Sequence, residues 1–247
     1  MGDDHIVKSF GGELKHIDQL IVEMGGHAET QLASAIRALV RRDADLANKV
    51  IEGDQRLDVL EVQINENIVR VLALRQPMAN DLRVAIAALK ISNELERIGD
   101  LAKNVAKRTL VLTQSPAMAA TLTISRMGTL VQGMIKGVLD AYIARDADAA
   151  EDIRMADEEV DQLHTSMFRE LLTYMMEDAR NITPCTHLLF IAKNIERIGD
   201  HTTNIAENVH FLVRGADPEA ARPKKDRSSL TAVRPHDAGS STRPGDQ

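Results

Sequence analysis

The chain has 247 residues, of which 44% are hydrophobic but only 2% aromatic, and its formal net charge is −7. A core of aliphatic side chains with almost no rings suits helix-on-helix packing, so the composition favours an all-helical protein. The negative charge argues against non-specific binding to nucleic acid. A single cysteine excludes an internal disulfide and fits a reducing compartment.

Targeting and membrane signals are weak in this sequence. The N-terminal residues lack the basic and apolar regions of a signal peptide. The longest uncharged stretch, residues 109–125, is too short to cross a bilayer and contains Gln, Ser and Pro. We therefore expect a cytoplasmic protein without direct membrane insertion.

Between widely spaced prolines, apolar residues recur with a period of about 3.6 residues, which predicts long amphipathic helices. In chain order we expect helices at residues 7–42, at 44–74, from about 82 to 115, from there to 144, at 147–177 and at 184–213. Pro77 ends the second of these helices, and Gly215 is well placed to end the last.

The second half of the chain repeats the first. Arg-Asp-Ala-Asp at residues 42–45 returns at 145–148, and Glu-Arg-Ile-Gly-Asp at 96–100 returns at 196–200. The economical explanation is two copies of a three-helix unit. We therefore predict an all-α fold of two pseudo-symmetric antiparallel three-helix bundles with six long helices. The expected bundles are residues 1–112 and 113–214, and the Pro-rich, polar residues 215–247 are expected to form a flexible C-terminal tail.

Each copy of the repeated pentapeptide places a glutamate and an aspartate on one face of a helix. If the preceding helix folds back antiparallel, two of its own aspartates lie at the same level. This geometry predicts one cluster of four carboxylates in each bundle. The residues are Asp54, Asp58, Glu96 and Asp100 in the first bundle, and Asp157, Asp161, Glu196 and Asp200 in the second.

The sequence leaves two interpretations of these clusters open. Oxygen ligands attract hard or borderline cations such as Mg²⁺, Mn²⁺ or iron, whereas zinc usually recruits Cys or His. Alternatively, Arg56, Arg97 and Arg197 could neutralise the carboxylates without a metal. Glu61 and His164 lie one helical turn further along and could join as outer ligands, although such a histidine is more often a surface residue.

The pentapeptide also contains a glycine in the middle of each predicted helix, at Gly99 and Gly199. A glycine there costs about 1 kcal/mol relative to alanine. We therefore expect the backbone of a neighbouring helix to approach closely at both positions.

Five stretches of the sequence resemble the PhoU proteins, accessory regulators of the phosphate-specific Pst transporter. They are Gln-Pro-Met-Ala-x-Asp-Leu-Arg at 76–83, Ala-Ala-Leu-Lys-Ile at 87–91, the two pentapeptides with their flanks at 95–100 and 195–201, and Leu-Leu-Thr-Tyr-Met-Met-Glu-Asp at 171–178. The resemblance covers about residues 10–214. It implies the same two-bundle fold and metal-binding E(D)-x-x-x-D signatures, which fall on the eight carboxylates named above. The implied cofactors are divalent or trivalent ions, with iron, manganese or magnesium expected before zinc.

The resemblance further implies a non-enzymatic adaptor that negatively regulates phosphate uptake and phosphate-starvation genes. The implied partners are the ATPase subunit of the Pst transporter and a sensor histidine kinase, and we also expect a homodimer. One alternative is a metal-dependent enzyme, either a phosphatase or a di-iron redox protein. The other is a histidine phosphotransfer bundle that uses His187 or His201. The sequence lacks paired Glu-x-x-His motifs, phosphate-binding glycine loops and a Gly-x-Ser-x-Gly motif, which weighs against the enzymes.

Overall fold

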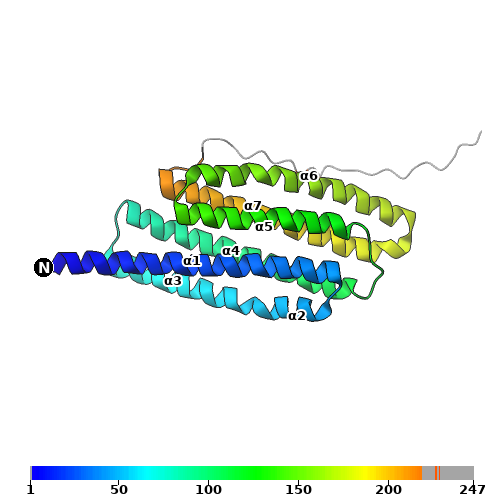
Figure 1. Ribbon diagram of the computed structural model, residues 1–247, viewed down its shortest axis with the longest axis horizontal. Coiled ribbons are helices and arrows are strands. Elements are labelled where there is room, and N and C mark those ends of the chain that lie inside the picture. The colour runs from blue at the N-terminus through cyan, green and yellow to red at the C-terminus, as the bar shows by residue number, and fades with distance from the viewer. Residues whose placement is uncertain (1, 219–225, 227, 229–247) are drawn as a thin grey trace, which may run out of the picture.

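The computed structural model describes residues 2–218, 226 and 228. Within these residues the chain is helical between short turns and contains no strand, which confirms the predicted fold class (Figure 1). The helices are α1 (Gly2–Arg41), α2 (Ala44–Gly53), α3 (Gln55–Arg75), α4 (Asn80–Leu112), α5 (Thr121–Ala144), α6 (Ala147–Glu177) and α7 (Ile182–Arg214), with a short 3₁₀ helix, η1 (Ala179–Asn181), before α7.

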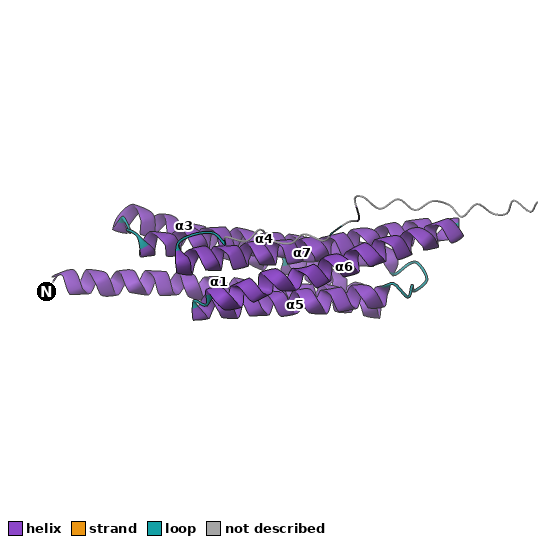
Figure 2. Cartoon of the chain, turned by 90° about the horizontal axis from the view of Figure 1, so that it is seen from above, coloured by secondary structure: helices purple, strands orange, loops and turns teal. Residues whose placement is uncertain are grey.

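The helices form two elongated bundles that lie side by side (Figure 1). The first bundle contains α1 to α4, and the second contains α5 to α7. α4 packs against α7 and α1 packs against α5, so these four helices join the bundles. The N-terminal end of α1 projects beyond the other helices (Figure 2).

The second predicted helix is divided into α2 and α3 at Asp54. The backbone of Asp54 nevertheless stays right-handed, with φ −60° and ψ −33°, and its carbonyl accepts a hydrogen bond from Leu57 N at 2.9 Å. The interruption follows Gly53, and glycine is one of the poorest helix formers. Together α2 and α3 occupy the place of one long helix.

The repeated Arg-Asp-Ala-Asp sequence has the same structural role in both bundles. Arg42 and Arg145 follow α1 and α5 in the left-handed conformation, with φ of 56° and 55°. The next residue caps the following helix, because Asp43 accepts from the amide of Leu46 and Asp146 accepts from two amides in the first turn of α6. The tetrapeptide therefore encodes a tight helix–turn–helix connection.

One continuous cluster of buried aliphatic side chains runs through all seven α-helices. A polar contact also links the bundles, since Tyr142 of α5 donates to the carboxylate of Asp18 in α1 at 2.5 Å, and Arg145 lies 2.8 Å from the same carboxylate. Burial raises the pKa of Tyr142, so its hydroxyl remains a donor. None of the helices that the structure describes combines the length and apolar composition needed to span a bilayer.

Candidate functional site

The α3–α4 and α6–α7 hairpins place some of the predicted carboxylates near one another. In the first bundle, Asp54 and Asp100 both contact the ammonium of Lys103, at 2.5 and 3.7 Å. In the second bundle, Asp157 of α6 packs on α7 beside Gly199, the residue that precedes Asp200. Each bundle therefore has an acidic cluster where its hairpin helices face each other.

Asp54 is the most deeply buried carboxylate of the first cluster, with 3% of its surface exposed. It accepts a hydrogen bond from Gln31 of α1 at 3.0 Å in addition to the Lys103 ion pair. The hydrogen bond to Asp54 raises the pKa of Lys103, so the ammonium form is favoured. The first cluster thus contains a cation supplied by the chain itself.

Glu96 and Asp100 lie closer to solvent than Asp54. Arg97 is 3.5 Å from Glu96 and 3.8 Å from Asp100, but its side chain is 64% exposed, so these pairs are weak. Burial, together with the neighbouring charge of Asp100, raises the pKa of Glu96 to about 7. Asp58 is exposed.

Arg56, one of the arginines expected to neutralise the first cluster, pairs with Glu23 of α1 instead. Its position at the α1–α3 contact allows it to reach across to α1. Among the ion pairs of this cluster, the shortest joins Lys103 to Asp54 and does not involve an arginine.

The second cluster is more deeply buried than the first. Its buried members are Asp157, Asp161, His164 and Glu196, each between 1% and 4% exposed, while Asp200 is half-buried. The interpretation of His164 as a surface residue is therefore wrong, because only 3% of this α6 residue is exposed. Burial lowers the pKa of His164, which favours the neutral imidazole.

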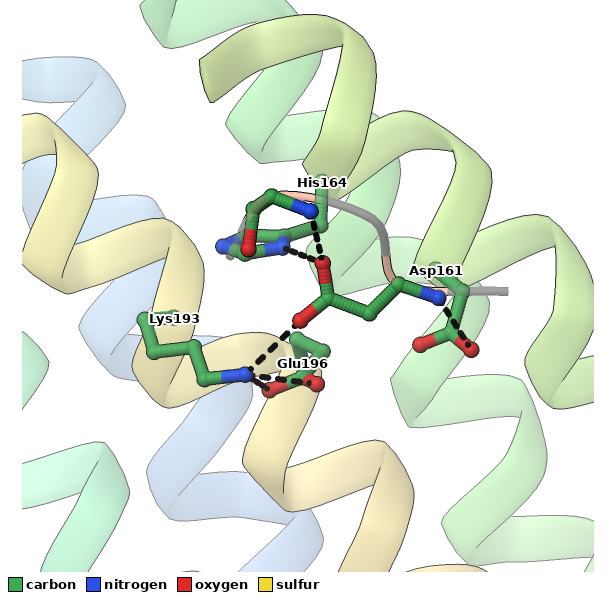
Figure 3. Close-up of polar contacts among 6 residues, drawn as sticks. Asp161, His164, Lys193 and Glu196 are labelled. Carbon is green, nitrogen blue, oxygen red and sulfur yellow. Dashed lines mark hydrogen bonds and ion pairs between the residues drawn. The ribbon is translucent and has the colours of Figure 1, made fainter. Parts of the chain in front are cut away.

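Lys193 neutralises part of the second cluster. Its ammonium lies 2.8 Å from Glu196 and 3.0 Å from Asp226, a residue that follows α7 (Figure 3). The backbone amide of Asp226 donates to Asp161 at 3.2 Å. Burial raises the pKa of Glu196 to about 7, although Lys193 acts in the opposite direction.

The carboxylates of the two clusters occupy corresponding positions of the repeat, whereas their lysines do not. In the repeat, Lys103 corresponds to Thr203, and Lys193 corresponds to Asn93. Sequence reasoning missed both lysines. The available signal was helical spacing, since each lysine lies three residues from a cluster carboxylate, where opposite charges meet on a helix.

The donor set of the clusters suits a hard cation, because carboxylate oxygens dominate it. Among the residues that the structure describes, however, no group of three or more His, Cys, Asp or Glu side chains is arranged to hold a metal ion. Lysine ammonium groups lie between the carboxylates in both bundles. A metal could enter only if the carboxylates moved together and a lysine moved away.

The two pentapeptide glycines lie against side chains of the facing helix. A Cβ on Gly99 would overlap the end of Leu57, and one on Gly199 would lie 2.6 Å from Asp157 Oδ1. The close approach expected at these positions exists, but the neighbouring group is a side chain and not a helix backbone. Gly199 therefore makes room for a carboxylate of the second cluster.

The two histidines proposed for phosphotransfer face the junction between the bundles. His201 Nδ1 lies 2.6 Å from Glu94 Oε2, so the imidazole is part of the α4–α7 contact. Burial and the charge of Arg108 lower the pKa of His187. Neither environment resembles a freely exposed histidine.

The fold and these clusters define a class of protein: a duplicated helical bundle with one acidic cluster in each half. A family model described as the PhoU domain matches the chain twice, over residues 21–109 and 124–209. The two matches correspond to the two bundles. The chain belongs to the PhoU family.

Similar proteins support this assignment along most of the chain. A Caulobacter vibrioides protein described as a phosphate-specific transport system accessory protein PhoU homolog is 55% identical over 90% of this chain and 97% of its own length. The PhoU protein of Escherichia coli is 41% identical over 86% of this chain and 88% of its own length. The crystal structure of PhoU from Pseudomonas aeruginosa superposes with a TM-score of 0.82 at 40% identity and covers 84% of this chain and 100% of that one.

Proposed function

We propose that this protein is an accessory regulator of phosphate transport. It acts in the cytoplasm as a non-enzymatic adaptor that lowers phosphate uptake by the Pst transporter and represses phosphate-starvation signalling through a sensor histidine kinase. The observation that carries the proposal is the 55% identity to a relative described as a phosphate-specific transport system accessory protein, over 97% of that relative's length.

The site chemistry supports an adaptor better than the enzyme alternatives. In both clusters, buried carboxylates are held by lysines in ion pairs, and neither arrangement positions a nucleophile beside a base. An adaptor acts by presenting surfaces, and the two bundles offer long helical faces for partners (Figure 1). The ATPase subunit of the transporter, the sensor kinase and a second copy of the chain are the proposed partners.

The partner proposal is tested by mixing the purified chain with the purified ATPase subunit and, separately, with the cytoplasmic part of the kinase. We expect a complex with each in analytical ultracentrifugation, and a dimer when the chain is alone. An unrelated transporter ATPase subunit is the control. A chain that binds the control as well as its partner, or that binds neither partner, contradicts the adaptor role.

We also propose that the acidic clusters bind metal ions, with iron, manganese or magnesium preferred over zinc. The support is the duplicated set of oxygen donors. Burial raises the pKa of Glu96 and Glu196, and a bound cation would favour their charged forms. When bound, the metal would supply the charge that Lys103 and Lys193 supply in its absence.

Thermal unfolding with and without each metal tests this second proposal. A bound ion raises the melting temperature by mass action, and the double variants Glu96→Gln/Asp100→Asn and Glu196→Gln/Asp200→Asn should each remove part of that increase. Glu52→Gln, at an exposed position of α2, is the control. An unchanged melting temperature of the wild-type chain with all four metals contradicts metal binding.

A further inference from the structure

The second acidic cluster holds a residue from beyond the part of the chain that matches the PhoU domain. That match ends at residue 209 and α7 ends at Arg214, whereas Asp226 lies among the cluster side chains. The carboxylate of Asp226 is 3.0 Å from Lys193 Nζ and 3.4 Å from His164 Nδ1 (Figure 3). It thus contacts one side chain from each helix of the α6–α7 hairpin.

The backbone around Asp226 takes part in the same contact. The amide of Asp226 donates to Asp161 Oδ2 at 3.2 Å, and the amide of Ser228 donates to Asp226 Oδ1 at 2.8 Å. Lys193 therefore forms an ion pair with the carboxylate, and Asp161 accepts a hydrogen bond from the backbone amide of the same residue. The hydrogen bond from the Ser228 amide restrains the orientation of the Asp226 carboxylate. Recognition at this place depends on more than charge.

The first bundle cannot make the same contact. The residues that correspond to Lys193 and His164 are Asn93 and Glu61. A carboxylate brought to that position would face the carboxylate of Glu61 in place of the imidazole and the amide of Asn93 in place of the Lys193 ammonium, which disfavours its binding. The recognition of an acidic residue is specific to the second bundle.

We propose that Asp161, His164, Lys193 and Glu196 form a recognition site for an acidic peptide segment, and that Asp226, with the amide of Ser228, is its built-in occupant. The ligand contains an aspartate whose carboxylate binds Lys193 and whose backbone amide binds Asp161. The amide two residues later donates to that carboxylate. A tethered ligand acts at an effective concentration of about millimolar. Any partner segment of this chemistry must displace Asp226, so the contacts of Asp226 set the threshold for docking.

The first measurement tests whether Asp226 and Ser228 occupy the site in solution. Amide hydrogen exchange of Asp226 and Ser228 is followed by NMR on the full chain in the presence of a chelator. We expect both amides to be protected in the wild type, with exchange about tenfold or more faster in Lys193→Gln and in Asp226→Ala. Asp217→Ala, an acidic residue between α7 and Asp226, should leave both rates unchanged. Unprotected amides in the wild type overturn the proposal.

The second measurement tests recognition in trans. A fluorescent peptide of residues 222–232 is titrated into full-length Asp226→Ala, in which the built-in carboxylate is absent. We expect the peptide to bind this variant about tenfold or more tightly than it binds the wild type. A peptide with alanine in place of its aspartate, and a receptor that also carries Lys193→Gln, should both lose binding. Equal binding to wild type and variant, or no binding to either, overturns the proposal. No transporter or kinase is present, so failure of the proposed function would not produce these results.

Discussion

At the level of single residues, Lys103 and Lys193 supply positive charge to the two acidic clusters. Lys103 contacts the buried carboxylate of Asp54, and Lys193 contacts that of Glu196. Removing one partner of a buried ion pair leaves an uncompensated charge in a poor solvent for it, so it costs more than the pair contributes. The carboxylates alone would repel one another, and the lysines explain how the chain folds with both clusters in place.

We predict that Lys103→Met destabilises the protein by about 1–3 kcal/mol, because Asp54 stays buried without its ammonium partner. Lys103 is 26% exposed at its side chain, so water can compensate for part of the loss. Urea unfolding with chelator present measures the effect. Lys107→Met, at an exposed position of the same helix, is the control, and equal stability of the two variants would contradict the role of Lys103.

The raised pKa values of Glu96 and Glu196 predict a pH dependence of stability. Both rise from an ordinary value of 4.5 to about 7, so the folded chain binds these protons more tightly than the unfolded chain. Their contribution to stability is therefore present below pH 4.5 and is lost as the pH rises to about 7.

Each carboxyl contributes about 1.4 kcal/mol per pKa unit at most, and Glu96 contributes less because it is closer to solvent. Denaturant unfolding between pH 4.5 and 8 with chelator present checks this dependence. The variant Glu96→Gln/Glu196→Gln should lose this part of the pH dependence of the unfolding free energy. Parallel curves for the two proteins would show that these carboxyls are not the cause.

At the scale of the elements, the hairpins position the carboxylates, and small residues allow the helices to fit. The absence of a side chain at Gly199 leaves space for the Asp157 carboxylate, and Gly99 leaves space for Leu57. The positions of these carboxylates could be predicted from the repeat and from symmetry about the turns. The side chains that contact the glycines could not be predicted, because these contacts depend on side-chain packing and not on helical period.

We predict that Gly199→Leu destabilises the protein by about 1–3 kcal/mol, because the new side chain must push Asp157 and α6 away. Gly133→Leu is a matched control in α5, since a Cβ there meets nothing within 4 Å. That control should be neutral or slightly stabilising, as glycine is a poor helix former. Calorimetry of both variants checks the prediction, and equal melting temperatures would show that Gly199 has no special packing role.

At the scale of the whole molecule, the two bundles share one core. Aliphatic residues of all seven α-helices belong to a single buried cluster, and α4 packs against α7 along the junction. The sequence predicted the helices and the duplication, because helical period and internal repeats are local signals. It did not predict Lys103, the burial of His164 or the contact of Asp226, because these depend on how separate helices and the C-terminal segment meet.

We predict that the full chain unfolds in one cooperative transition, because the bundles are joined by a common apolar core. Thermal unfolding is followed by calorimetry and by circular dichroism at the same time. Agreement between the calorimetric and van't Hoff enthalpies is the expected result. Two separated transitions would mean that the bundles are independent units.

We propose that the protein lowers phosphate uptake, and an uptake measurement in a bacterium that lacks its own PhoU-family protein but retains the Pst transporter tests this proposal. Expression of this chain should lower the rate of phosphate uptake and reduce the activity of a phosphate-starvation reporter at high phosphate. The same cells carrying an empty vector are the control. If folded chain accumulates and both readings stay equal to those of the control, the protein is not an accessory regulator of phosphate transport.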